Sequence, residues 1–239
     1  LADDKEDTPI MQSEHYTLGV LFAKNKFQLE VEAYHKRMAN LASFSPIFLD
    51  NFQDEEYAEG TGKVWGIDLM LQRKWKHYQT WVSYTYSRIF YTFAIYNNNE
   101  PFPAPHDRPH VLTFMHQWNI AHWAIAVSWK YASGKTFTAP SSILMEEDLV
   151  VPQYDYQDTN DERLPQYHRL DASILYQFNG KNEKWRGKFG LSFLNLYNRQ
   201  NLLSRQFFVF EDEEEYFLDQ LDRSMLRFTP NLVFRLSWN

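Results

Sequence analysis

The segment HDRPH carries residue types that could bind a metal ion. His106 and His110 are four residues apart and enclose Asp107 and Arg108. A spacing of four places two ligands on one face of a helix. Two prolines lie close by, however, so a loop is expected and the helical ligand geometry is not. We therefore expect structural wall residues here, with Asp107 and Arg108 fixing the entry from a loop into a strand.

The segment RLPQYHRLD concentrates Arg163, Tyr167, His168, Arg169 and Asp171. A buried charge needs a partner, so the preferred interpretation is a network of paired charges, with Arg169 and Asp171 on the same side of a strand. Two other interpretations stay open, namely contact with a substrate and a catalytic Asp–His pair, because the spacing alone excludes neither. No serine nucleophile signature accompanies these residues.

The acidic run EDEEE occupies residues 211–215. A run of like charges is usually a solvated loop, although its oxygen atoms would also suit Ca²⁺ or a cationic substrate. The apolar segment 207–210 directly precedes it. Apolar residues inside a long link predict a hairpin that projects from the fold, where it could close over an entrance or pack on a partner.

The elements that must position these residues follow a period of two. In WVSYTYSRIF, residues 81–90, aromatic and apolar side chains alternate with serine and threonine, as in a strand with one apolar and one polar face. No long stretch has a helical period, so the fold class is all-β. The same alternation recurs in nine segments: 16–23, 27–33, 65–72, 81–90, 112–119, 123–131, 169–178, 185–193 and 231–238.

The links between these strands alternate in length. Loops above about 12–15 residues are uncommon in a compact domain, yet every second link here is long. Short periplasmic turns and long extracellular loops are typical of a transmembrane antiparallel β-barrel. A water-soluble β-sandwich remains an alternative, but its core would contain too many Trp and Tyr side chains. The tight turns lie near 24–26, 73–77, 120–122 and 179–184, and the long links near 38–60, 92–107, 133–168 and 199–228.

The composition excludes several classes of protein. The chain has 239 residues and no cysteine, so a disulfide framework or a thiolate metal site is impossible. A formal net charge of −7 argues against a nucleic-acid partner. The longest apolar run, residues 123–127, is far too short for a transmembrane helix. Aromatic residues reach 18%, which suits strands and the aromatic girdles of a membrane barrel.

The orientation of the strands predicts an incomplete barrel. If the tight turns are periplasmic, the last strand ends at a periplasmic Asn239 and residues 1–12 are extracellular. Closed bacterial barrels normally have an even number of strands, and an open edge in lipid costs several kcal/mol for each unpaired backbone group. Unless the count of nine is wrong by one, this chain is expected not to close a barrel alone.

An ordered set of segments resembles the C-terminal half of the barrel in TonB-dependent outer-membrane receptors, particularly those of the Bacteroidetes type. The resemblance implies a 22-stranded barrel with an N-terminal plug in its lumen. Residues 1–239 would form about nine C-terminal strands, with the plug and the TonB box outside this chain. The segments are GKVWGIDLMLQRK, WVSYTYSRI, PAPHDRPHVLTF, WKYASGKTFTAP, RLPQYHRLDASILYQF, KFGLSFLNLYNRQN and TPNLVFRLSWN.

The same resemblance implies the active import of a scarce nutrient, such as a siderophore, vitamin, glycan or peptide, without enzymatic activity, cofactor or metal. The implied partners are outer-membrane lipid, the plug or the remaining strands, the TonB complex and, as a further candidate, a surface lipoprotein. The family usually ends in an aromatic residue, whereas here Trp238 is penultimate. A self-contained outer-membrane barrel enzyme, a protease or a lipid hydrolase, is the alternative. The expected lumen or rim residues are Asp107, Arg108, His110, Arg163, Tyr167, His168, Arg169 and Asp171.

Overall fold

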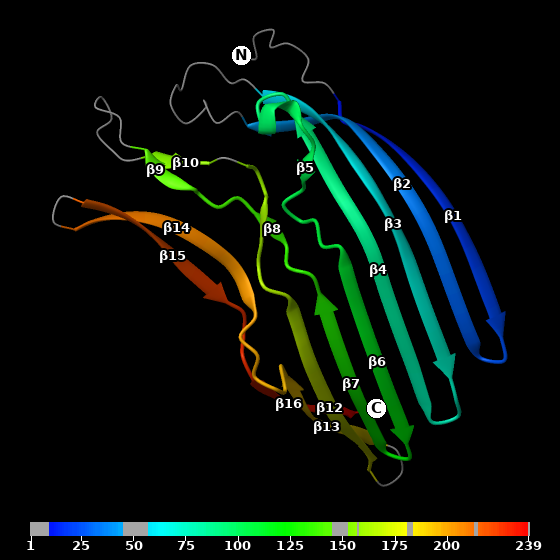
Figure 1. Ribbon diagram of the computed structural model, residues 1–239. Coiled ribbons are helices and arrows are strands. Elements are labelled where there is room, and N and C mark those ends of the chain that lie inside the picture. The colour runs from blue at the N-terminus through cyan, green and yellow to red at the C-terminus, as the bar shows by residue number, and fades with distance from the viewer. Residues whose placement is uncertain are drawn as a thin grey trace, which may run out of the picture.

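In the computed structural model, nine antiparallel strands form the continuous path of a ten-stranded sheet, and the tenth, short strand pairs beside this path (Figure 1). The structure describes residues 10–44, 57–144, 153–156, 158–180, 184–212 and 215–238. The nine predicted strands are confirmed, and they pair in the order β1-β2-β3-β4-β6-β7-β12-β13-β16. Their bounds are β1 Gln12–Lys24, β2 Phe27–Phe44, β3 Tyr57–Lys74, β4 Tyr78–Phe93, β6 His110–Ile120, β7 Trp123–Ala132, β12 Tyr167–Asn179, β13 Trp185–Leu194 and β16 Thr229–Trp238.

The predicted difference between the two ends of the sheet is present in the structure. The β1–β2, β3–β4 and β6–β7 turns lie together at one end, and the long links leave the other (Figure 1). Asn25 and Lys26 close the β1–β2 turn with φ of 48° and 66°. Two successive positive φ angles are what a type I′ turn requires, and its twist matches that of the flanking strands.

The first long link is shorter than the predicted range 38–60. β2 continues to Phe44 and β3 begins at Tyr57, so much of this range is strand. The register slips between Met38 and Leu41, where Asn40 has a φ of 57°. Such a β-bulge bends a strand and re-aims the side chains beyond it. The upper part of β2 therefore presents a different set of side chains from the one that simple alternation predicts.

The other three predicted long links contain strands of their own. Residues 92–107 include the end of β4, the 3-10 turn η2 (Asn97–Asn99) and β5 (Phe102–Pro103), which pairs with β4. The predicted hairpin near 207–210 is confirmed, because β14 (Leu202–Asp212) pairs with β15 (Glu215–Ser224). Within 133–168, β8 (Thr136–Phe137) pairs with β11 (Glu162–Arg163), β9 (Ser142–Leu144) pairs with β10 (Gln153–Asp155), and the range closes on the start of β12.

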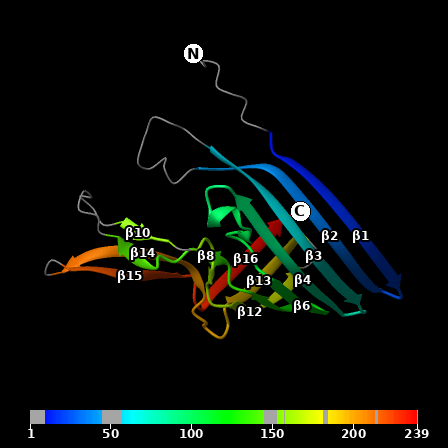
Figure 2. The ribbon, with the colours of Figure 1, turned by 45° about the horizontal axis from the view of Figure 1, so that its top comes forward.

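The β14–β15 hairpin projects beside β9 and β10, away from the main sheet (Figure 2). Tyr154 donates a hydrogen bond to the Phe207 carbonyl at 3.1 Å, and the rings of Phe137 and Phe207 stack with centroids 6.1 Å apart. The inner side of the hairpin thus packs on the neighbouring link. Two residues of the predicted acidic run, 213 and 214, lie outside the described residues.

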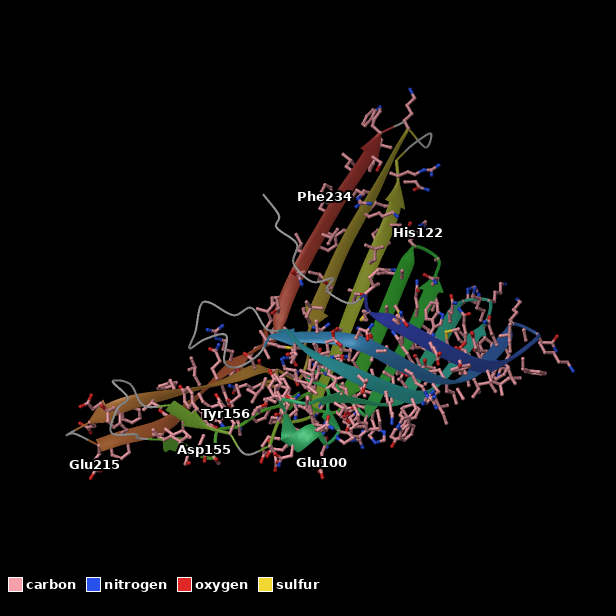
Figure 3. The ribbon with its side chains drawn as sticks, turned by 90° about the horizontal axis from the view of Figure 1, so that it is seen from above. Glu100, His122, Asp155, Tyr156, Glu215 and Phe234 are labelled. Carbon is pink, nitrogen blue, oxygen red and sulfur yellow. The ribbon has the colours of Figure 1, made fainter. Side chains whose placement is uncertain are left out.

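The two faces of the main sheet differ in kind. We call the face that carries Tyr84 and Ile67 the apolar face, and the one that carries Ser83 and Asp68 the polar face. Large side chains on the apolar face are solvent-accessible: Leu18 is 78% exposed and Phe234, labelled in Figure 3, is 63% exposed. A sandwich would bury such a face against a second sheet. Its exposure fits a wall that faces lipid.

In the described part of the chain, no helix has the length and hydropathy needed to cross a bilayer.

Candidate functional site

Asp107 is the centre of a charged network at the base of the long links. Its side chain is fully buried. One carboxylate oxygen accepts a hydrogen bond from the backbone N–H of Ile89 at 2.8 Å, and the other pairs with the guanidinium of Arg163. Arg88 Nε lies 3.5 Å from the same carboxylate. The structure thus joins two residues predicted from separate motifs, and their pairing fixes β11 to β4.

Gly134 allows the chain to approach this network closely. A guanidinium nitrogen of Arg163 donates to the Gly134 carbonyl at 3.1 Å. A Cβ atom built on Gly134 would lie 1.6 Å from the Leu164 carbonyl oxygen, a backbone atom that cannot move aside alone. Any side chain here must therefore separate the strand pair β8–β11.

We expect Gly134→Ala to loosen the 133–168 link while leaving the main sheet intact. Overpacking costs about 1–3 kcal/mol, which raises the population of the locally opened link about fivefold or more. Limited proteolysis with mass mapping measures this opening. Gly19→Ala is the matched control, because its Cβ would meet neighbouring atoms at an ordinary 3.5 Å or more. Equal cleavage rates in the two variants would contradict this role of Gly134.

A second buried polar centre lies at the base of the β14–β15 hairpin. Asn195 is fully buried, and its side chain both donates to the Arg199 carbonyl at 2.7 Å and accepts from the Arg199 N–H at 3.0 Å. Asn201 makes a similar reciprocal pair with the backbone of His168, at 3.0 and 3.2 Å. These two amides replace strand pairing where the chain turns, and they hold the 195–201 segment against β12.

Arg169 and Asp171 form an ion pair on the polar face of β12. Two guanidinium nitrogens of Arg169 lie 2.7 and 3.0 Å from one Asp171 oxygen, and the other oxygen accepts from the Asn195 N–H at 2.9 Å. His168 projects from the opposite face of β12, and its Nδ1 lies 2.7 Å from the Tyr197 hydroxyl. His168 and Asp171 therefore do not form the catalytic pair that their spacing left open.

The two histidines of HDRPH contact different faces of the sheet. The ring of His106 contacts Tyr91, which lies on the polar face. Nδ1 of His110 lies 2.8 Å from the hydroxyl of Tyr84, on the apolar face. Arg108 forms no hydrogen bond or ion pair with any described residue. Throughout the described ranges, no group of three or more His, Asp or Glu side chains is arranged to hold a metal ion.

A cavity of about 700 Å³ opens between the long links, and we call it the rim pocket. Residues from the end of β2, the end of β4, the 95–105 segment, the residue after β8 and the 156–160 segment line it. The bulge at Asn40 contributes by turning Ser43 toward it. A pocket built from five separate segments is assembled only when those segments have come together.

Aromatic rings form much of the rim pocket. Phe93 and Phe102 are buried, 5% and 4% exposed, with ring centroids 6.3 Å apart. Tyr96 meets Phe93 edge-on at 5.8 Å. Tyr156, by contrast, is 52% exposed, and Figure 3 shows it beside Asp155. Buried rings give the pocket a rigid floor, and the accessible Tyr156 ring is available for stacking on a bound molecule.

The polar groups of the rim pocket are neutral amides and hydroxyls. The Asn97 side-chain oxygen accepts from the Thr159 N–H at 2.8 Å, which ties the 95–105 segment to the 156–160 segment. Asn160 donates to the Pro103 carbonyl at 2.9 Å and accepts from Thr138 at 3.4 Å. Among the described residues that line the pocket, none carries a formal charge. The chemistry on offer is ring stacking and neutral hydrogen bonding.

An ion pair stabilises the exposed part of the hairpin. Arg205 donates to both oxygens of Asp222, at 2.7 and 2.9 Å. These hydrogen bonds lower the pKa of Asp222 below its ordinary value and raise the pKa of Arg205. The pair is therefore ionised at neutral pH. Its contribution is present above the ordinary pKa of an aspartate and is lost as the pH falls through the lowered value.

Sequence reasoning did not identify the buried amides and hydroxyls as positioning residues. Asn160, Asn195, Asn201 and Thr136 are all buried. A usable signal was present, because asparagine favours turns in which its side chain bonds the local backbone. Asn195 and Asn160 also have positive φ, 54° and 57°.

Comparison with known proteins adds one match. A family model for the β-barrel of TonB-dependent receptor-like proteins matches residues 11–198. That range covers the first eight strands of the main sheet, from β1 to β13, and the network around Asp107. No curated protein matches the chain.

Proposed function

Since this chain belongs to the β-barrel family of TonB-dependent receptors, we propose that it takes part in the active import of a scarce nutrient and that the rim pocket contacts the nutrient. The family's barrels span the outer membrane and transport their substrates without enzymatic activity. In the proposed orientation the long links are extracellular and the C-terminus is periplasmic. The plug, the remaining strands and the TonB complex complete the transporter, and a surface lipoprotein is a candidate partner at the outer side.

The observation that carries the proposal is the contrast between the two faces together with the position of the pocket. A face with exposed Leu18, Ile67 and Phe234 fits lipid. The rim pocket lies at the end of the sheet where the long links gather, which is the end that would meet the medium. Substrate sites of rigid scaffolds are commonly built from such links.

The function is tested by uptake in cells that lack the full-length receptor. A growth screen in media limited for single nutrients identifies the substrate, and labelled uptake is then measured with plasmid-borne receptor. Uptake should stop when the proton gradient of the inner membrane is collapsed. Uptake that persists without the gradient, or growth that never depends on the receptor, would refute active import.

Within this experiment, Tyr156→Ala should raise the half-saturating nutrient concentration about two- to twelvefold, because a stacked ring contributes about 0.5–1.5 kcal/mol. Phe210→Ala is the matched control, since Phe210 is similarly exposed but lies on β14, outside the rim pocket. Equal uptake curves for wild type and Tyr156→Ala would show that the pocket does not contact the nutrient, even where import itself is gradient-dependent.

A further inference from the structure

The apolar face changes character near the end of the sheet where the β1–β2 and β3–β4 turns lie (Figure 1). One row of side chains, which we call the turn-end row, crosses five neighbouring strands there and contains two cations, a hydroxyl and an imidazole. The register joins its members in the order Lys24, Phe27, Arg73, Thr80 and His116. The next row toward the long links is wholly apolar and consists of Phe22, Leu29, Leu71, Val82 and Phe114.

An aromatic ring holds the arginine of the turn-end row. The guanidinium carbon of Arg73 lies 4.6 Å from the ring centroid of Trp75, and the Trp75 ring in turn lies 4.7 Å from that of Tyr78. An arginine stacked on a ring keeps its N–H edge free for two parallel hydrogen bonds to a phosphate or carboxylate. Arg73 and Lys24 are both exposed, and neither forms an ion pair with any described carboxylate. The row therefore has two cations without a counter-charge.

Thr80 and His116 add hydrogen-bonding capacity to the same row. The Thr80 hydroxyl oxygen lies 2.7 Å from Nδ1 of His116. Nε2 of this ring is buried and has no hydrogen-bond partner in the part of the chain that the structure describes. When Thr80 donates to Nδ1, Nε2 carries the hydrogen, and a shielded donor without an acceptor costs free energy. Cations and donor alike lack an oxygen acceptor.

The turn-end row lies at the level expected for a membrane interface. About 9–11 residues of a tilted strand cross the hydrocarbon layer, and tryptophan is enriched at both of its boundaries. The segment from Trp65 to Trp75 matches this length. Between these two rings, the residues of β3 on the apolar face are Ile67, Leu69, Leu71 and, last, Arg73. The arginine therefore reaches the depth at which lipid headgroups begin.

The two cations are a local feature of one flank. On the apolar face of β7, β12, β13 and β16, no described residue is a lysine or an arginine. Aromatic rings continue there without them, with the Trp123 and Tyr176 centroids 4.7 Å apart. Lys24 and Arg73 are two strand spacings apart, about 10 Å between backbones, so their long side chains can converge on one anion. This convergence distinguishes the flank from an ordinary aromatic girdle.

We propose that the turn-end row binds the headgroup of an anionic phospholipid from the surrounding membrane. Arg73 pairs with the phosphate through its N–H edge, Lys24 supplies the second positive charge, and the acyl chains lie along Leu71 and its apolar neighbours. The two rows thus match the two parts of one lipid molecule. A free phosphate ion would leave the apolar row uncovered. The inference rests on the proposed function, in which the apolar face meets lipid.

Native mass spectrometry of the full-length receptor in detergent tests the site. Phosphatidylglycerol and phosphatidylcholine with the same acyl chains are titrated separately, and inorganic phosphate is added as a competitor. We expect phosphatidylglycerol to bind about tenfold more tightly than phosphatidylcholine, and an equal concentration of inorganic phosphate not to displace it. Equal affinity for the two lipids, or displacement by inorganic phosphate, would overturn the inference. This comparison needs no substitution in the protein.

Lys24→Gln combined with Arg73→Gln should weaken the binding of phosphatidylglycerol about tenfold or more and leave that of phosphatidylcholine nearly unchanged. The reason is that each cation near an anionic lipid strengthens binding by about fivefold. Lys74→Gln combined with Lys130→Gln is the matched control, because it removes two cations from the polar face. An unchanged affinity in the first variant, or an equal loss in both, would refute a site at the turn-end row.

Spin labels separate failure of this site from failure of the proposed function. One label replaces Leu69 on the apolar face and another replaces Met70 on the polar face of the receptor in lipid vesicles. Stronger relaxation by dissolved oxygen at position 69 than at position 70 means that the apolar face meets hydrocarbon. With that result, a missing preference for phosphatidylglycerol overturns the lipid site alone. The opposite order of accessibilities would refute both the site and the orientation on which the proposed function depends.

Discussion

Asp107→Ala is expected to lower the free energy of unfolding of the link region by about 3–5 kcal/mol. Removing one partner of a buried ion pair leaves the others uncompensated in a low-dielectric setting. Asp107 is fully buried, and its carboxylate both accepts a hydrogen bond from the backbone N–H of Ile89 and pairs with the guanidinium of Arg163. The loss of unfolding free energy should lie near the lower end of this range, since Arg88 and Arg163 are partly exposed and can be rehydrated.

Urea unfolding of the receptor in detergent, followed by proteolysis of the links, measures this loss. Asp161→Ala is the matched control, because Asp161 is an exposed carboxylate in the 133–168 link, close in sequence to Arg163, and we expect a change within about 0.5 kcal/mol. Combining Asp107→Ala with Arg163→Met should recover part of the loss, because no uncompensated charge then remains at that contact. If Asp107→Ala were as mild as Asp161→Ala, the network would not be what joins β11 to β4.

Placing an arginine on the apolar face should impair folding into a bilayer by about 2–4 kcal/mol at positions near its midplane. Leu191 and Ile125 suit the test, because the register places both on the same face and next to Ile174. The physical reason is the cost of holding a charge in hydrocarbon. Folding yields in lipid vesicles over a urea series measure the free energy for Leu191→Arg and Ile125→Arg.

Ser192→Arg and Ser128→Arg are the paired controls for these two substitutions. Each serine is close in sequence to the residue it controls but lies on the polar face, where an arginine can remain hydrated. We expect their cost to be clearly smaller. Equal penalties on the two faces would count against the orientation of the wall, because they would mean that neither face meets lipid.

The two buried polar centres explain how an open sheet can present an ordered set of links. The Asp107 network joins the 104–107 segment, β4 and β11, and Asn195 joins β12 to the base of the hairpin. The rim pocket lies against the first of these regions and depends on its assembly. The Asp107 and Gly134 substitutions should therefore also lower uptake, through the position of the pocket lining and without contact with the nutrient.

The strands were predictable because the alternation of side chains is local. One face must be compatible with lipid and the other with water, so a period of two marks all nine strands of the main sheet. The predicted strands ended too early at the upper ends of β2 and β3, where strand also covers residues 34–44 and 57–64. Where a wall rises beyond hydrocarbon both faces can be polar, so the pattern disappears while the backbone pairing continues.

The same local rule bears on the candidate site. The structure separates His168 and Asp171 on opposite faces of β12, a point that their spacing in the sequence had left open. The orientation of the wall in the membrane, the plug and the nutrient stay predictions, and the experiments above test the orientation and the nutrient.

The sequence by itself determined the fold class, the order of the strands and the contrast between the two faces, since each depends on neighbouring residues or on the lengths of links. Only the tertiary structure decided which distant residues meet. Arg163 reaches Asp107 across 56 positions, and five segments converge on the rim pocket. Such meetings depend on the register of each strand and on buried hydrogen bonds such as those of Asn195. They are properties of the assembled links, and no periodic pattern along the chain encodes them.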